Sequence, residues 1–202
     1  MPTPSPALTT VLKTERLFLR PYRPEDDALY FGMLAENREH LFEFMPEKVL
    51  ELQTAADAGA FLRWLNGEWQ LGSLFLFALW DKASGLYLGE TYLANPDWHV
   101  PSIELGYFRV QAATGQGYAT EAARAALRFA FEILNVSRVD LQCRADNAAS
   151  MRVAQRLGFR QEGCQRLRHR KKDGALVDRL WYGLLHAEWQ SKSEIRNPEM
   201  KK

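Results

Sequence analysis

The stretch TGQGYATEA, residues 114–122, decides the fold, because it connects a predicted strand to a predicted helix through a turn with two glycines. Gly115 and Gly117 let the backbone approach a ligand closely. The unpaired N–H groups of the first helical turn and the helix dipole favour an anion there, and a diphosphate fits. A tight strand-to-helix turn that binds no ligand is the alternative interpretation of the same residues. Thr120 replaces the third glycine of a dinucleotide-binding fold, and the Gly-Lys-Ser/Thr of a P-loop is absent.

Predicted strands flank this turn and its helix. In residues 102–110, apolar side chains such as Leu105 alternate with Glu104 and Gly106, so the glycine leaves a gap on the side of Glu104. Residues 139–143 alternate in the same way. A strand, a helix and a strand at this spacing predict a right-handed parallel crossover.

The rest of the chain predicts a mixed α/β domain. Pro24 is typical of a helix start, Thr54 is a candidate N-cap for a second helix that Gly72 ends, and Asp173-Gly174 predicts a hairpin. We expect a mostly antiparallel central sheet of about seven strands, with four helices and one parallel β-α-β crossover. The helices are expected at residues 24–41, 54–71, 118–135 and 148–157, and the strands at 16–20, 73–81, 86–93, 102–110, 139–143, 160–170 and 175–185.

The domain limits follow from where this pattern begins and stops. The chain has 202 residues, which suits a single domain that buries most of its apolar surface. Residues 1–13 are rich in Pro and Thr, and residues 191–202 are polar. Both are expected to be flexible tails, so the domain is expected at residues 14–190.

Composition argues against several classes of protein. The 26 Lys and Arg residues nearly balance the 25 Asp and Glu residues, unlike the basic surface of a DNA-binding protein. No apolar run approaches the roughly 18 residues that cross a bilayer, and the N-terminus does not resemble a secretion signal. We expect a cytoplasmic protein that binds neither DNA nor membrane.

The cysteine and histidine pattern does not predict a metal site. Cys143 and Cys164 are the only cysteines, and no Cys-x-x-Cys pair or His spacing completes a zinc site. We expect two free thiols that pack in the protein.

Three stretches occur in an order and at a spacing that are specific together. They are ELGY at 104–107, TGQGYATEA at 114–122, and DNAASMR at 146–152 followed by LGF at 157–159. In these stretches the chain resembles the Gcn5-related N-acetyltransferase (GNAT) superfamily, and within it the RimJ/RimL-like group that acetylates the N-termini of bacterial ribosomal proteins. The resemblance spans nearly the whole expected domain. It implies the GNAT fold, acetyl coenzyme A (acetyl-CoA) as co-substrate, no metal ion and a homodimer.

The resemblance also implies which residues bind the coenzyme. Backbone amides of the turn would hold the diphosphate, and the strand around Phe108 to Val110 would pair with the pantetheine arm. The chain departs from the family at Ala112 and Thr114, where Gln or Arg is common. The implied coenzyme-binding residues are Phe108, Val110, Gly115, Gln116, Gly117, Tyr118, Ala119, Thr120 and Asn147, the last of which could instead only cap the helix that follows it.

Acetyl transfer to an amine needs a neutral amine, a stabilised oxyanion and a proton for the departing thiolate. An α-amine with a pKa near 7.8 is roughly a tenth neutral at pH 7, so a modest base suffices. Glu104 is the candidate base, directly or through water, and a salt-bridged strand glutamate is the alternative. Ser150 aligns with a serine near the thioester sulfur in the resembling enzymes and is the candidate acid, with helix capping as the alternative. A backbone N–H near Val110 is the expected oxyanion donor.

The sequence therefore predicts an acetyl-CoA-dependent N-acetyltransferase and leaves its acceptor open. The first hypothesis is direct transfer to the N-terminal α-amine of a protein such as a ribosomal protein. The second is transfer to a small-molecule amine, such as a polyamine, an antibiotic or an aminoacyl conjugate. The third is a protein that senses acyl-CoA without turnover, against which the presence of Glu104 and Ser150 argues.

Overall fold

One sheet of eight strands runs through the residues that the structure describes. The structure, a computed structural model, describes residues 6–7, 9–41, 45 and 47–196, without the side chains of 47, 48 and 192–196. The strands are β1 (Leu12–Lys13), β2 (Leu17–Arg20), β3 (Leu74–Asp81), β4 (Tyr87–Asp97), β5 (Ser102–Arg109), β6 (Arg138–Arg144), β7 (Arg160–Arg170) and β8 (Leu176–Leu185). Their order is β1-β2-β3-β4-β5-β6-β8-β7, and every pair is antiparallel except β5 with β6.

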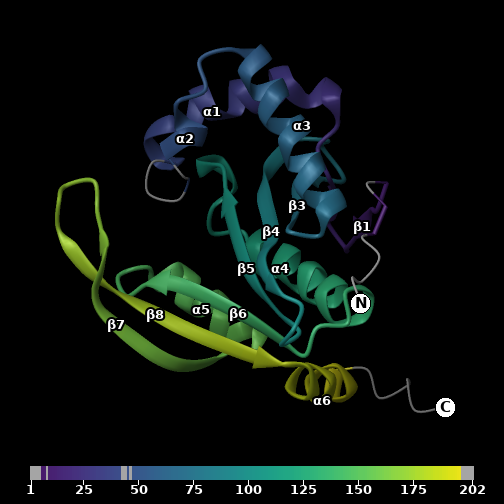
Figure 1. Ribbon diagram of the computed structural model, residues 1–202, viewed down its shortest axis with the longest axis vertical. Coiled ribbons are helices and arrows are strands. Elements are labelled where there is room, and N and C mark those ends of the chain that lie inside the picture. Colours follow the sequence, from purple (N-terminus) through teal and green to yellow (C-terminus); the bar gives the residue numbers. More distant parts are fainter. Residues whose placement is uncertain (1–5, 8, 42–44, 46, 197–202) are drawn as a thin grey trace.

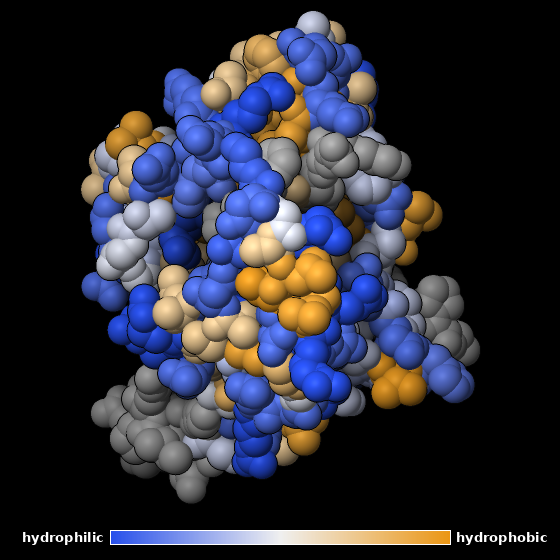
Figure 2. All heavy atoms as spheres, turned by 90° about the vertical axis from the view of Figure 1, so that its left-hand side faces the viewer, coloured by the Kyte–Doolittle hydropathy of each residue, from blue (hydrophilic) through white to orange (hydrophobic). Residues whose placement is uncertain are grey.

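Helices cover the sheet on both sides. They are α1 (Asp27–Leu41), α2 (Glu47–Leu50), α3 (Ala55–Leu71), α4 (Tyr118–Arg128), α5 (Ala148–Leu157) and α6 (His186–Arg196). Figure 1 shows α1, α2 and α3 gathered at one end of the molecule, α4 behind β4 and β5, and the β7–β8 hairpin extending away from the other strands. Viewed from the hairpin side, most of the surface is hydrophilic (Figure 2).

The predicted helix ends are confirmed by their hydrogen bonds. Thr54 Oγ1 accepts from the N–H of Asp57 at 3.1 Å, and Asp57 accepts from the N–H of Thr54 at 3.0 Å, which forms a capping box at the start of α3. Gly72 ends α3 in the left-handed region, with φ of 71°. At this position glycine avoids the steric cost of a Cβ atom.

The helix α4 packs closely on the sheet because of its small residues. Ala119, Ala122, Ala123 and Ala126 are buried against a core that includes Leu105 of β5. Small side chains let the helix axis come near the strands, as the sequence predicts. A second core, on the opposite side of the strands, lies under α1 and α3.

The two strands of the crossover pair only at their beginnings. The parallel ladder joins Ser102 to Arg138, Ile103 to Val139 and Glu104 to Asp140, and it extends no further. Beyond these three pairs β5 remains paired with β4, and β6 remains paired with β8. The sheet therefore splits between β5 and β6.

The ordered structure reaches into both segments that the sequence assigns to tails. In the N-terminal segment, β1 pairs with β2, and Trp69 Nε1 donates to the carbonyl of Pro6 at 2.7 Å. At the other end α6 continues past residue 190 to Arg196, and Trp189 packs on Phe131 with ring centroids 5.8 Å apart. β1 has two residues, which is too short for an alternating sequence pattern, so its formation depends on pairing with β2. The outer parts of both tails lie outside the described residues.

The cysteines differ in their surroundings. Both are free thiols, and Cys143 is buried as expected, but Cys164 is exposed on the outer strand β7, so the expectation that it packs is wrong. Alternation along a strand does not show whether a further strand covers it. In the part of the chain that is described, no helix combines the length and the apolar character needed to cross a bilayer.

Candidate functional site

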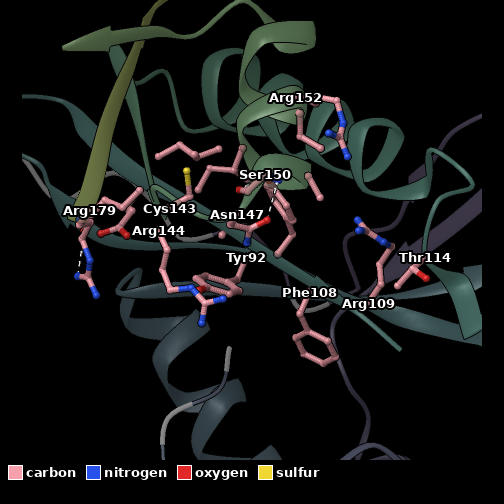
Figure 3. A pocket seen from close by; sticks show the side chains of 18 of the residues that line it. Tyr92, Phe108, Arg109, Thr114, Cys143, Arg144, Asn147, Ser150, Arg152 and Arg179 are labelled. Atoms are coloured by element: carbon pink, nitrogen blue, oxygen red, sulfur yellow. Dashed lines mark hydrogen bonds between the residues drawn. The ribbon is translucent and has the colours of Figure 1, made fainter. Parts of the chain in front are cut away.

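A cavity of about 470 Å³ lies where β5 and β6 separate. Residues of β5, β6 and α5 line its walls, and Thr114 and Gly115 border it beside the start of α4. Figure 3 shows Arg109 and Thr114 at one end of this cavity and Arg144 and Arg179 at the other. The split in the sheet therefore brings together the three motifs that are separate in the sequence.

The edge of β5 that faces the cavity offers unpaired backbone groups. Val110 donates its N–H to the carbonyl of Leu88 at 3.1 Å, which makes these two residues a hydrogen-bonded pair of the β4–β5 ladder. Because such pairs alternate in an antiparallel ladder, the N–H groups of Tyr107 and Arg109 point the other way, toward β6. Phe108 borders the cavity with its side chain, but its backbone, like that of Val110, faces β4. The free amides nearest the predicted oxyanion donor are thus those of Tyr107 and Arg109.

The glycine turn has the conformation that an anion site needs. Gly115 and Gly117 have φ of 78° and 82°, which only glycine adopts without strain. Gly117 is the N-cap of α4 and supplies no side-chain acceptor, so the first N–H groups of the helix have no cap. Gly115 lies at the cavity.

The side chains of the other turn residues point elsewhere. Ala119 is buried in the core, and Thr120 borders a separate hollow near β1. The Arg16 guanidinium lies over the Tyr118 ring, 4.5 Å from its centroid. The Gln116 side chain donates to the carbonyl of Ala112 at 3.2 Å. None of these four side chains lines the cavity, so these turn residues can offer a ligand there only their backbone groups.

An ion pair between Arg16, the residue before β2, and Glu121 of α4 holds the turn in place. Arg16 Nε donates to Glu121 at 2.7 Å, and the Thr14 hydroxyl donates to the same carboxylate at 2.5 Å. Arg16 Nη1 also donates to the carbonyl of Gln116 at 3.0 Å. Burial raises the pKa of Glu121, but the hydrogen bonds from Thr14 and Arg16 outweigh burial and lower it. The ionised carboxylate also suits the positive end of the α4 dipole.

Ser150 belongs to a small polar cluster beneath α5. Its hydroxyl lies 2.9 Å from the Tyr107 hydroxyl, and its N–H donates to Asn147 Oδ1 at 3.0 Å. Asn147 is therefore the N-cap of α5, and the Ser150 hydroxyl is left to contact β5. Burial raises the pKa of Tyr107 to about 12, so this phenol stays protonated at neutral pH. Burial also raises the pKa of the Cys143 thiol, and a hydrogen bond with Ser150 offsets part of this rise.

Glu104 is the last residue of β5 that pairs with β6, so its carboxylate lies where the split begins. It borders the cavity and accepts a hydrogen bond from Asn95 Nδ2 at 3.1 Å. The gap that Gly106 leaves beside it is occupied by the Tyr92 ring. A Cβ atom at Gly106 would lie 2.1 Å from Tyr92 Cζ, so only glycine fits there. The expectation of an open gap on the side of Glu104 is therefore wrong, because the Tyr92 ring of β4 fills the space.

Comparison with known families decides which chemistry these features serve. The acetyltransferase (GNAT) domain matches residues 16–160 of the chain, which include β2 to β6 and α5. The chain belongs to the GNAT acetyltransferase family. This GNAT chain is an acyltransferase of the N-acetyltransferase type, with a mixed α/β fold as expected.

Proteins similar to this GNAT chain include one relative by sequence and two solved structures with the same fold. It is 28% identical over 173 residues to the ribosomal protein uS5-alanine N-acetyltransferase of Escherichia coli (strain K12), covering 84% of the chain and 85% of the relative. It shares its fold with RimL, a ribosomal L7/L12 alpha-N-protein acetyltransferase in complex with coenzyme A (TM-score 0.79, 18% identity, 87% and 98% coverage). It also shares the fold of MccE, a microcin C7 self-immunity acetyltransferase in complex with acetyl-CoA and AMP (TM-score 0.74, 18% identity, 85% and 93% coverage).

Apart from Arg152, which ends the motif at 146–152, the arginines of the cavity lie outside the GNAT motifs, and the sequence does not predict them as site residues. At one end Arg144 pairs with Asp146 at 3.0 Å, and Arg179 donates to Gln142 at 3.3 Å. At the other end burial lowers the pKa of Arg109, whose Nη1 is buried and has no hydrogen-bond partner. An available signal for Arg109 is its place on the apolar face of β5, two residues after Tyr107, where a cation is unusual.

Proposed function

We propose that this GNAT protein transfers the acetyl group of acetyl-CoA to the N-terminal α-amine of a protein, such as a ribosomal protein. The observation that carries the proposal is the cavity itself, which connects the free edge of β5, the uncapped turn before α4 and the Tyr107–Ser150 pair. Free strand amides suit an extended amide-containing arm, and free helix N–H groups suit a diphosphate. Coenzyme A carries both groups in one molecule.

The described residues fit this coenzyme. Backbone amides from Gly115 to Thr120 would hold the diphosphate, and the amides of Tyr107 and Arg109 would face the pantetheine arm. When bound, acetyl-CoA supplies the activated acetyl group as a thioester. The chain then has to orient this group, accept a proton from the amine and provide one for the sulfur.

Glu104 and Ser150 are proposed for the two proton transfers. Glu104 lies at the start of the split, where an amine could reach the thioester, and it would accept the amine proton directly or through a water molecule. The Ser150 hydroxyl lies deeper, held by Tyr107, and would donate a proton to the sulfur. Because Tyr107 stays protonated at neutral pH, it can replace the proton that Ser150 gives away.

A small-molecule amine is the second candidate acceptor. One support is the similarity to MccE, whose structure is a complex with acetyl-CoA and AMP. The other is the presence of Arg144 and Arg179 at the end of the cavity opposite Arg109, since arginines suit an anionic molecule. A protein acceptor is supported by the greater sequence identity to the uS5-alanine N-acetyltransferase.

Mass spectrometry of acetylated products tests the proposal. Peptides with a free N-terminus, the same peptides with a blocked N-terminus and a free lysine, polyamines and aminoacyl nucleotides are each incubated with acetyl-CoA and the protein. We expect a 42 Da increase only on free α-amines. Transfer to the small amines alone would support the second candidate, and binding of acetyl-CoA without any transfer would support an acyl-CoA sensor.

A further inference from the structure

Arg109 is a partly buried cation, and one nitrogen of its guanidinium is buried. It is carried by the last residue of β5 and borders the cavity beside Thr114. Its Nη1 is shielded from solvent and has no hydrogen-bond acceptor in the part of the chain that the structure describes. Tyr107, two residues earlier on β5, has its hydroxyl engaged with Ser150.

Such a group lowers the stability of the folded protein. Removing a cation from water costs free energy that only a paired anion or good hydrogen bonds recover. Glu104 is the one carboxylate among the described residues that line the cavity, and it lies at the start of the split, five residues before Arg109 along an extended strand. The fold therefore keeps a positive charge at a place where no carboxylate among the described cavity residues contacts its buried Nη1.

The position of Arg109 identifies the class of anion that would balance it. The turn with Gly115 borders the same end of the cavity, and its uncapped N–H groups also favour negative charge. Figure 3 shows the side chains of Arg109 and Thr114 together at this end. Ala112 and Thr114 supply no cation from the turn itself, although Gln or Arg is common at these positions in the GNAT enzymes that the sequence resembles.

Taking coenzyme A as the ligand, as proposed above, we propose that Arg109 binds its diphosphate and supplies from the strand the cation that the turn lacks. The helix N–H groups and the guanidinium would contact the diphosphate from different elements. Arg109 is then a binding residue that secures the coenzyme, and the unfavourable burial of its charge is relieved only in the complex.

The stability of the ligand-free protein gives the first test. Arg109→Met keeps a long side chain but removes the charge, so we expect its melting temperature to equal or exceed that of the wild type. Arg156→Met is the matched control, because Arg156 is exposed at the end of α5 and outside the cavity. A clearly lower melting temperature for Arg109→Met alone would show that the guanidinium already makes stabilising contacts, and it would overturn the proposal.

Calorimetry with coenzyme A, dephospho-coenzyme A and pantetheine gives the second test. Hydrogen bonds to charged groups predict that Arg109→Met weakens the binding of the first two about ten- to a hundredfold and leaves pantetheine unchanged. Arg109→Lys should recover part of the loss. Equal weakening of pantetheine would mean that the site is distorted, and an effect on coenzyme A but not on dephospho-coenzyme A would move Arg109 to the 3′-phosphate. Either result overturns this proposal, whereas a wild type that binds no coenzyme A overturns the proposed function as well.

Discussion

At the scale of single residues, a substitution at Glu104 tests the proposed catalytic step separately from coenzyme binding. Its carboxylate is proposed to accept the amine proton, whereas backbone groups and Arg109 are proposed to hold the coenzyme. We expect Glu104→Gln to lower kcat about a hundredfold at pH 7, which is the lower end of general-base effects, because an α-amine is partly neutral at this pH. Raising the pH to 9 should restore much of the rate.

Steady-state kinetics with a peptide acceptor at both pH values measure this effect, and calorimetry shows whether coenzyme affinity is kept. Glu132→Gln, on the exposed side of the turn after α4, serves as the control. Undiminished kcat in Glu104→Gln would leave Glu104 with the structural role of accepting a hydrogen bond from Asn95.

A second prediction at this scale concerns Glu90, which is buried in the core away from the cavity. It is 2% exposed, and burial raises its pKa from 4.5 to about 7, although the Tyr22 hydroxyl donates to it at 2.6 Å. The folded protein therefore binds a proton that the unfolded chain has released between these pH values. This contribution to stability is present below about pH 4.5 and is lost as the pH rises through 7.

Glu90→Gln has no such titration. Between pH 4.5 and pH 8, the free energy of unfolding of the wild type should therefore fall by about 3 kcal/mol relative to that of Glu90→Gln. Urea denaturation of both proteins across this range measures the difference. Parallel pH dependences would show that Glu90 titrates normally in the folded protein.

At the scale of elements, Asn147 stabilises the start of α5, the helix that carries the site residue Ser150. As the N-cap it fixes the first turn of the helix that carries Ser150. We expect Asn147→Ala to lower the free energy of unfolding by about 1 kcal/mol, whereas Asn147→Ser, which keeps a capping oxygen, should lose much less.

Thermal unfolding and acetyl transfer by the two variants distinguish the two roles of Asn147. If Asn147 acts only as a cap, Asn147→Ser keeps both stability and activity. If it also contacts pantetheine, as the family resemblance implies, Asn147→Ser keeps stability but raises the KM for acetyl-CoA.

At the scale of the whole molecule, the split in the sheet predicts that a bound coenzyme would bridge the two parts of the sheet. Only three residue pairs join β5 to β6, so a ligand in the cavity connects the five strands on one side of the split to the three on the other. Coenzyme A at a hundred times its Kd should stabilise the fold by about 2.7 kcal/mol and raise Tm by about 5–10 °C. ADP, which has a diphosphate but no pantetheine arm, should have a much smaller effect at the same concentration. Differential scanning calorimetry measures both shifts, and equal shifts would argue against a role for the β5 edge.

The sequence predicts most elements because their signals are local. Thr54 and Gly72 limit α3, the alternation in residues 102–110 identifies β5, and the glycine turn precedes α4. β1 and α6 were not predicted, since one has two residues and the other follows β8 without a break. Their formation depends on β2 and on the burial of Trp189.

The sequence by itself determined the mixed α/β class, the crossover and the backbone character of the turn, because these depend on neighbouring residues and on side-chain period. Only the tertiary structure decided where the sheet splits, that the Tyr92 ring fills the space at Gly106, and that Ser150 meets Tyr107, 43 residues away. It also decided that Nη1 of Arg109 is buried and has no hydrogen-bond partner among the described residues. Burial and pairing of this kind depend on contacts between distant segments, and a local pattern does not contain them.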